Sequence, residues 1–377
     1  MRHALVHHAC IVALGLLLAA VARADRTVEV ATDDALRAAL RDARPGDTLR
    51  IASGVYRGGI YAQDLHGTKA QPIALTAADP NQPPIIRGGN VGIHLVNPRH
   101  VTLSDLTIEQ CKDNGLNIDD GGTMQATAQD VTLTKLTVRD IGPQGNHDGI
   151  KLSGVRDLLV TRCTLERWGD GGSGIDMVGC HEGRITECVL RNRDASAATG
   201  VQAKGGCTGI VIDRCRFEHA ARRAINLGGS TGEAFFRPPL QPDGNAEARN
   251  VRVEACVFIG SDAPVAFTTS VHCSVTDNII YRPSRWVLRL LQEQPLDRFV
   301  SSGDHTFAAN TIIWRKGDLH AFVNVGPNTR PDTMRFVGNT WYCEDDPTPS
   351  TPTLPAPEHR GVHGQRPPEE VWKRISP

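Results

Sequence analysis

Apolar and polar residues alternate in short segments that recur along the chain. Nine such segments follow one another, with their last residues 22 to 41 positions apart. Alternation with a period of two is typical of a strand with one buried and one exposed face. The segments are His100–Leu106, Asp130–Leu136, Asp157–Cys163, Glu182–Cys188, Gly209–Cys215, Asn250–Cys256, His272–Asn278, Asp304–Asn310 and Thr333–Asn339.

Most of these repeats contain a second short strand. A single repeat of this size cannot bury its own apolar face, but stacked repeats can, because each strand pairs with its copy in the next repeat. The connections lack the helical periodicity that a barrel or a doubly wound sheet would need. We therefore predict an all-β parallel β-helix of roughly nine to ten coils. The second strands include Gly115–Asp119, Gly149–Ser153, Gly174–Val178, Gly200–Lys204 and Ala224–Gly228.

The N-terminal 24 residues differ from the repeats. Arg2, a short apolar run over Cys10–Val21 and the small residues of Ala22–Ala24 form the pattern of a signal peptide with its cleavage site. The run is too short to span a membrane. We therefore expect a secreted or periplasmic protein without membrane insertion.

The remaining chain divides into a β-helix domain, residues 25–345, and a proline-rich tail, residues 346–377. Asp33–Ala43 has the pattern of an amphipathic helix with Thr32 as its N-cap. This helix is predicted to cover the open edge of the first coil, which a solenoid must protect.

Composition narrows the possible partners. The chain has 41 Lys and Arg against 42 Asp and Glu, a net charge of −1, which removes the electrostatic argument for nucleic acid or an anionic membrane surface. A hydrophobic fraction of 40% excludes disorder for most of the chain. The ten cysteines need an explanation, although Cys10 would leave with the signal peptide.

Four cysteines occupy the last position of successive repeat segments, and three asparagines occupy the same position in the segments that follow. Equal phase in a stacked coil means one column with steps of ~4.8 Å. We interpret the cysteines as small buried residues and the asparagines as a hydrogen-bonded turn ladder. A disulfide among the other cysteines is left open, because an exported chain meets an oxidising compartment. The column comprises Cys163, Cys188, Cys215, Cys256, Asn278, Asn310 and Asn339, and the others are Cys111, Cys180, Cys207, Cys273 and Cys343.

Polar residues collect on the outward phase of the second strands. Residues of equal phase on neighbouring coils lie side by side, so cations, carboxylates and amides converge on one sheet face. The only long insertion between repeats, Gly232–Glu247, comes directly after them and carries two aromatics that could stack on sugar rings. There is a structural alternative for each feature. The polar face could be an ordinary solvated surface, and the two aromatics could anchor the loop to the wall of the solenoid. The residues concerned are Asp148, Lys151, Asp176, Gln202, Lys204, Arg223, Asn226, Phe235, Phe236 and Arg237.

These residues suggest chemistry on an acidic glycan. Removing the proton next to a uronate carboxylate requires a base near that carbon and a cation that neutralises the carboxylate. Lys204 is the candidate base, because Lys151 and Arg223 would favour its free amine by like-charge repulsion. Arg223, or the adjacent Arg222, is the candidate charge stabiliser. The candidates for substrate binding are Lys151, Gln202, Asn226, Arg222, Phe235, Phe236 and Arg237.

Asp148 and Asp176 allow two further interpretations. Their oxygens could hold a Ca²⁺ ion that bridges to the substrate carboxylate. Alternatively, two carboxylates on adjacent coils could flank a glycosidic bond as in a glycoside hydrolase. A third hypothesis is a non-catalytic carbohydrate-binding solenoid, whose polar face only binds a polysaccharide.

The chain also resembles a known family. Pro45–Tyr56, Ile85–Gly88 and Val101–Ile108 are similar to the N-terminal part of β-helix polysaccharide lyases of the pectate-lyase-like superfamily, in particular the chondroitinase B and alginate lyase family. The similarity extends over about Ala31–Asn339. It implies a right-handed helix, which the crossover rule also favours, and cleavage of an acidic glycan by β-elimination.

The resemblance also assigns roles to residues. Gly200–Gly206 resembles the strand that carries the family's catalytic lysine, which places that role on Lys204. The family's catalytic arginine would fall near Asn226, close to Arg223 but not on it. The family's acidic calcium ligands fall on Ala197 and Thr199.

Overall fold

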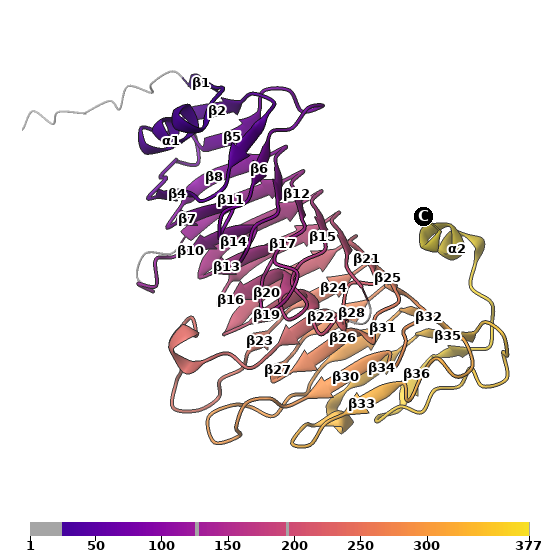
Figure 1. Cartoon of the computed structure of the whole chain (residues 1–377). Helices are drawn as coiled ribbons and strands as arrows, with labels where there is room; N and C mark the ends of the chain where they lie inside the picture. Colours follow the sequence, from indigo (N-terminus) through magenta and orange to yellow (C-terminus); the bar gives the residue numbers. More distant parts are fainter. Residues whose placement is uncertain (1–24, 125–127, 194–195, 377) are drawn as a thin grey trace, which may run out of the picture.

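The computed structural model describes residues 25–124, 128–193 and 196–376, so the predicted signal peptide lies outside the described residues. The described chain winds through three parallel sheets, here named sheets A, B and C (Figure 1). Each coil contributes a strand to sheet A, then to sheet B, then to sheet C. Ten strands line up in sheet C, one per coil, which confirms the predicted parallel β-helix and its number of coils.

The strands have these bounds. Sheet A contains β1 (Arg26–Val30), β2 (Asp47–Ile51), β5 (Ile73–Ala77), β8 (Arg99–Ser104), β11 (Ala128–Thr134), β14 (Val155–Thr161), β17 (His181–Thr186), β20 (Cys207–Asp213), β24 (Arg252–Glu254), β28 (Ser274–Thr276), β31 (Thr306–Ala308), β34 (Arg335–Val337) and β36 (Glu358–His359), with β23 (Ala248–Arg249) and β27 (Ser270–Val271) at its side. Sheet B contains β3 (Val55–Arg57), β6 (Ile85–Arg87), β9 (Thr107–Glu109), β12 (Thr137–Arg139), β15 (Thr164–Glu166), β18 (Val189–Arg191), β21 (Arg216–Glu218), β25 (Val257–Ile259), β29 (Ile279–Tyr281), β32 (Thr311–Trp314), β35 (Thr340–Cys343) and β37 (Val362–His363). Sheet C contains β4 (Ile60–Gln63), β7 (Ile93–Val96), β10 (Leu116–Asp119), β13 (Ile150–Ser153), β16 (Ser173–Val178), β19 (Thr199–Lys204), β22 (Arg223–Gly228), β26 (Ala263–Thr268), β30 (Leu288–Leu291) and β33 (Val323–Val325).

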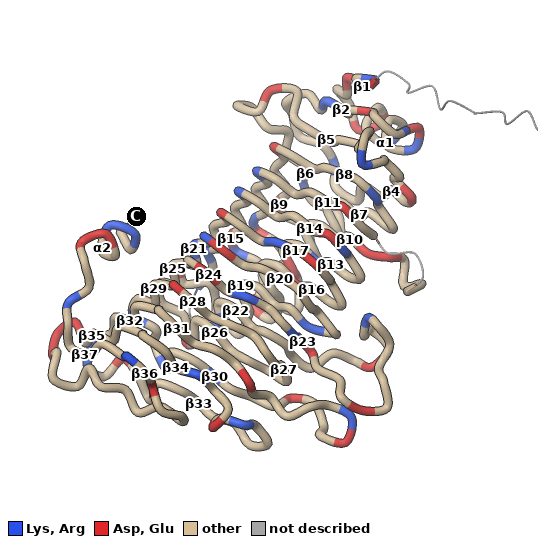
Figure 2. Tube along the Cα trace, turned by 180° about the vertical axis from the view of Figure 1, so that it is seen from behind, with Lys and Arg blue, Asp and Glu red and all other residues tan. Residues whose placement is uncertain are grey.

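The period-two pattern produces the core directly. In sheet C the register pairs Ile150 with Ile175 and Ile175 with Val201, and all three side chains are fully buried. Apolar side chains of equal phase therefore stack inside the solenoid, while the residues between them face outward. Basic and acidic residues are interspersed along the chain trace (Figure 2), in keeping with the net charge of −1.

A helix covers the N-terminal end of the solenoid, and strand pairing continues into the C-terminal tail. Helix α1 spans Asp33–Arg41, begins with the Thr32 side chain accepting a hydrogen bond from the Ala35 amide at 3.2 Å, and buries its apolar face as predicted. It ends two residues before the predicted limit. Strand pairing continues beyond residue 345, because β36 and β37 extend sheets A and B. Helix α2 (Glu369–Ile375) follows. Within the described part of the chain, no helix is long and apolar enough to cross a membrane.

The predicted turn column is present. The Asn278 amide donates to Asn310 Oδ1 at 2.9 Å, and the Asn310 amide donates to Asn339 Oδ1 at 3.0 Å. The Asn339 amide ends the ladder on Glu358 at 2.8 Å. The cysteines that precede them are buried and donate from Sγ to backbone carbonyls. All nine cysteines of the described residues are free, including those for which a disulfide was left open.

The chain without residues 1–24 is therefore expected to show nine free thiols after denaturation and none that react in the native state. Burial raises the pKa of Cys111 and Cys273 to about 12, which keeps these thiols protonated as well as inaccessible. Titration with a thiol reagent before and after addition of denaturant measures both numbers. One thiol or none in the denatured chain would contradict the column interpretation.

Candidate functional site

The predicted polar face forms on sheet C. Lys151, Asp176, Gln202 and Asn226 occupy one register position on β13, β16, β19 and β22. Their strand neighbours on either side, such as Ile175 and Met177, are buried in the solenoid. Alternation within each strand and parallel pairing between strands therefore build this row, which we call the outward row.

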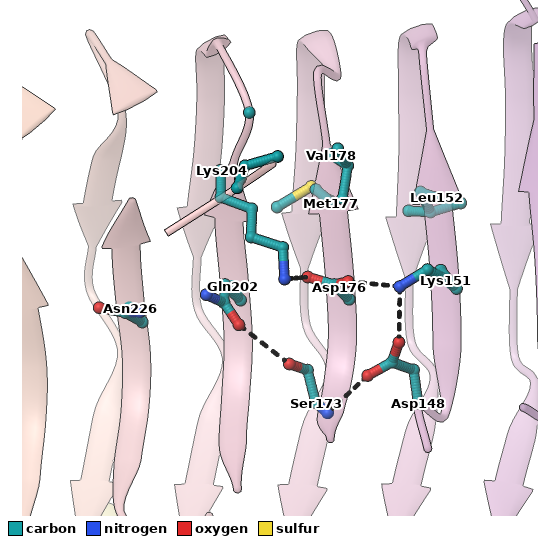
Figure 3. Close-up of polar contacts among 12 residues, drawn as sticks. Asp148, Lys151, Leu152, Ser173, Asp176, Met177, Val178, Gln202, Lys204 and Asn226 are labelled. Atoms are coloured by element: carbon teal, nitrogen blue, oxygen red, sulfur yellow. Dashed lines mark hydrogen bonds and ion pairs between the residues drawn. The ribbon is translucent and has the colours of Figure 1, made fainter. Parts of the chain in front are cut away.

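Two lysines meet one carboxylate at the centre of the row (Figure 3). Lys151 Nζ lies 2.7 Å from Asp176 Oδ2 and 3.0 Å from Asp148 Oδ2. Lys204 Nζ reaches Asp176 Oδ1 from the other side at 3.1 Å. Asp176 thus links the two ammonium groups, and Asp148 completes a chain of four alternating charges.

Burial distinguishes the members of this chain. The Asp148 and Asp176 side chains are 1% and 2% exposed, whereas those of Lys151 and Lys204 are 31% and 21% exposed. Burial and the charge of Asp176 raise the pKa of Asp148, even though its Oδ1 accepts a hydrogen bond from the Ser173 amide at 2.7 Å. Burial opposes the charge on Lys151, but the two carboxylates outweigh it and raise its pKa. The two lysine side chains, rather than the two carboxylates, are therefore the groups that a ligand can reach.

This arrangement does not fit the predicted calcium site. The Lys151 ammonium already lies between the Asp148 and Asp176 carboxylates, in the place that a bridging cation would take. In the described residues, no group of three or more His, Cys, Asp and Glu side chains is placed to hold a metal ion. The two carboxylates are therefore the partners of the Lys151 ammonium group.

The two amides of the row differ in accessibility. The Gln202 side chain is half-buried, accepts from Ser173 Oγ at 3.4 Å and donates to the Gly228 carbonyl at 3.3 Å. Asn226 is only 2% exposed, and its Oδ1 accepts from Thr268 Oγ1 at 2.7 Å. Gln202 can therefore contact a ligand. Asn226 is buried and bonded to the neighbouring strand β26, so it does not fit the predicted substrate contact.

The structure does not bring Arg223 to Lys204. Arg223 pairs in register with Thr199, at the start of β19, while Lys204 is at the end of that strand. Five residues of extended chain separate the two positions by about 16 Å. Arg223 instead contacts Glu293 Oε1 at 3.1 Å, and the adjacent Arg222 is exposed. Lys204 was predicted to act with Arg223 or Arg222 on the same sugar carbon. The strand register places these arginines too far from Lys204 for that.

The insertion between β22 and β23 folds back along the chain. It contains a short 3₁₀ helix, η1 (Glu233–Phe235). Phe236 is 1% exposed and packs on Phe299 at 5.5 Å between ring centroids. It therefore anchors the insertion to the wall of the solenoid and is not available to stack on a sugar ring. Phe235 is 61% exposed and stays available to a ligand. Arg237 forms a bidentate pair with Asp120, at 2.5 and 2.7 Å, and is therefore already neutralised within the chain rather than free for a substrate acid group.

Sequence reasoning missed two clusters on the same face. His94 Nε2 lies 2.6 Å from Asp119 Oδ2, and the exposed Tyr61 ring packs against His94 edge-on. At the other end of the row, Arg289 lies two strands beyond Asn226. Both lie at outward-facing positions of sheet C strands. Applying the alternation of inward and outward residues to every coil would therefore have found them.

The chain is similar to known proteins in fold. Residues 123–285 match the family described as right handed beta helix region. No curated protein matches the sequence significantly. The A-module of the Azotobacter vinelandii mannuronan C-5 epimerase AlgE6 superposes with a TM-score of 0.59 at 13% identity, over 90% of this chain and 96% of that one.

Two lyases superpose similarly. For an alginate lyase from Paenibacillus sp. str. FPU-7 the TM-score is 0.52 at 18% identity, over 80% of this chain and 98% of that one. For a mannuronic acid specific polysaccharide family 6 lyase from human gut microbiota it is 0.54 at 13% identity, over 89% and 82%. At such identities the likeness concerns the fold. The stacked coils, the family match over residues 123–285 and these neighbours together show that the chain has the right-handed parallel β-helix fold.

Proposed function

We propose that this chain is an exported carbohydrate-active protein, a polysaccharide lyase that cleaves a uronate-containing glycan by β-elimination. One observation carries the proposal: two partly exposed lysines on the outer face of sheet C are joined through one buried carboxylate, Asp176. Cations side by side on an open sheet face suit a polymer with a carboxylate on each sugar. The lyases above share this fold, which supports the proposal.

In the proposed reaction Lys204 is the base and Lys151 is the charge stabiliser. The Lys204 amine takes the proton from C5, the released electron pair forms the C4–C5 double bond, and the C4–O bond breaks. The departing oxygen takes a proton, for which the newly formed Lys204 ammonium is the nearest donor. Lys151, which its two carboxylate partners keep charged, neutralises the substrate carboxylate while negative charge builds up on it.

The contacts support this division of roles. Lys151 donates hydrogen bonds to both Asp148 and Asp176. The contact of Lys204 with Asp176 is an ion pair in which Asp176 Oδ1 receives no hydrogen bond from a described residue. Lys204 is therefore the less tightly held of the two amines. Lys151 replaces Arg223 as charge stabiliser because it lies beside the same carboxylate.

The same geometry argues against a hydrolase that uses Asp148 and Asp176. A glycosidase places its two carboxyl groups on opposite sides of the scissile bond. Here both carboxylates are buried, and Lys151 occupies the space between them. A sugar ring has no access to that space.

Ultraviolet absorbance on alginate, polygalacturonate and chondroitin sulfate tests the proposal. β-Elimination produces an unsaturated, absorbing sugar end, so absorbance is expected to rise with at least one polymer. Release of reducing ends without absorbance would favour a hydrolase instead. Binding of a polymer with neither signal would favour the non-catalytic solenoid.

A further inference from the structure

Four arginines gather beyond the lysines on the same side of sheet C. Arg289 on β30 takes the register position of Ala266, which itself pairs with Asn226, so it belongs to the outward row. Burial and the positive charges of Arg223 and Arg222 lower the pKa of Arg289 to about 10. We call Arg222, Arg223, Arg285 and Arg289 the arginine cluster.

The cluster is held in place by its surroundings. The guanidinium carbons of Arg285 and Arg289 lie 4.4 and 4.5 Å from the centroid of the Trp286 ring. Arg289 Nε donates to Asn324 Oδ1 at 2.9 Å, and Arg223 contacts Glu293. Cation–π contacts and hydrogen bonds of this kind fix the direction of a planar guanidinium before any ligand arrives.

The positive charge of the cluster is only partly neutralised. Glu293 contacts Arg223, and Asp262 lies 3.7 Å from Arg285, so two carboxylates face four guanidinium groups. Arg289 Nη1 and Arg285 Nε are buried and have no hydrogen-bond partner among the described residues. A buried N–H group of a charged side chain that has no acceptor lowers the stability of the folded protein. An anion placed among them would supply the missing acceptors and relieve the repulsion.

We propose that the arginine cluster is a second binding site of the groove, which holds a carboxylate or sulfate group of the glycan several sugar rings away from Lys204. This inference rests on the proposed function for the identity of the polymer, but not for the binding of an anion. Arg289 is four strands from Asp176 along the outward row, which is ~19 Å at the spacing of paired strands. A single sugar cannot bridge that span, so the substrate is a long acidic chain laid along the solenoid axis.

Thermal unfolding tests the site without using activity. Sodium sulfate and sodium galacturonate are compared with sodium chloride at matched ionic strength, for the wild type, Arg289→Gln and Arg285→Gln. Arg335→Gln is the matched control, an exposed arginine on β34 of sheet A. We expect sulfate or galacturonate to raise the unfolding temperature of the wild type and the control more than that of either cluster variant. The more effective anion identifies the group that the site prefers, and equal shifts in all four proteins would overturn the inference.

Chain length provides the second measurement. On a polymer that the wild type cleaves, Arg289→Gln is expected to raise KM roughly tenfold for long chains, the effect of one lost charged hydrogen bond. It is expected to leave kcat and the KM for short oligosaccharides within about twofold, since these cannot reach the cluster. An unchanged KM for long chains would contradict the second site. A thermal shift in a protein that cleaves no polymer would overturn the lyase proposal and leave the anion site standing.

Discussion

Replacing Lys204 with alanine is expected to lower the rate of unsaturated-product formation by a factor of about 10² to 10⁴, the usual contribution of a positioned general base. The reason is that no other described amine contacts Asp176 except Lys151, which two carboxylates hold in its charged form. Initial rates of absorbance increase at saturating polymer measure the effect.

Lys135→Ala is the matched control for this experiment. Lys135 also pairs with an aspartate, Asp105 at 3.6 Å, but it follows β11 of sheet A and is away from the outward row. Its activity should stay within twofold of the wild type. If Lys204→Ala kept full activity while its unfolding temperature was unchanged, Lys204 would not be the base.

The largest loss of stability is expected for Glu247→Ala. Glu247 is completely buried, and its carboxylate accepts from the Gly205 amide at 2.7 Å, the Thr231 amide at 2.6 Å and Gln294 Nε2 at 2.6 Å. Alanine would leave these buried donors unpaired, at about 1–3 kcal/mol for each. We expect the free energy of unfolding to fall by about 3 kcal/mol or more, which is about 4 °C in unfolding temperature for a chain of this size.

Glu254→Ala separates this effect from the loss of any glutamate. Glu254 on β24 is partly exposed and pairs with Arg252 at 3.5 Å, a contact worth about 0–1 kcal/mol. Differential scanning calorimetry on both variants makes the comparison. Because Glu247 joins both ends of the insertion to the turn after Lys204, its loss should also lower activity. Equal stability of the two variants would show that the insertion is held by other contacts.

The fold could be predicted because its information is local and repeated. Alternation assigns each side chain to the inside or the outside, and equal phase assigns it to a column, as the asparagine ladder from Asn278 to Asn339 shows. The polar face of sheet C followed from the same rule. Alternation along a strand does not say which partner a charged side chain takes, however. The sequence therefore left Asp148 and Asp176 open as calcium ligands or as a hydrolase pair, whereas in the structure both contact Lys151.

The sequence by itself determined the parallel β-helix, its approximate number of coils, a capping helix that begins at Asp33 and the sheet face that carries Lys151 and Lys204. Only the tertiary structure decided which charges meet. Arg223 is on the coil next to Lys204 yet at the other end of the strand, and Arg237 reaches Asp120, 117 residues earlier in the chain. Strand phase follows from neighbouring residues in the sequence, whereas ion pairs depend on the path of the insertion and on distances across several coils, which no local pattern encodes.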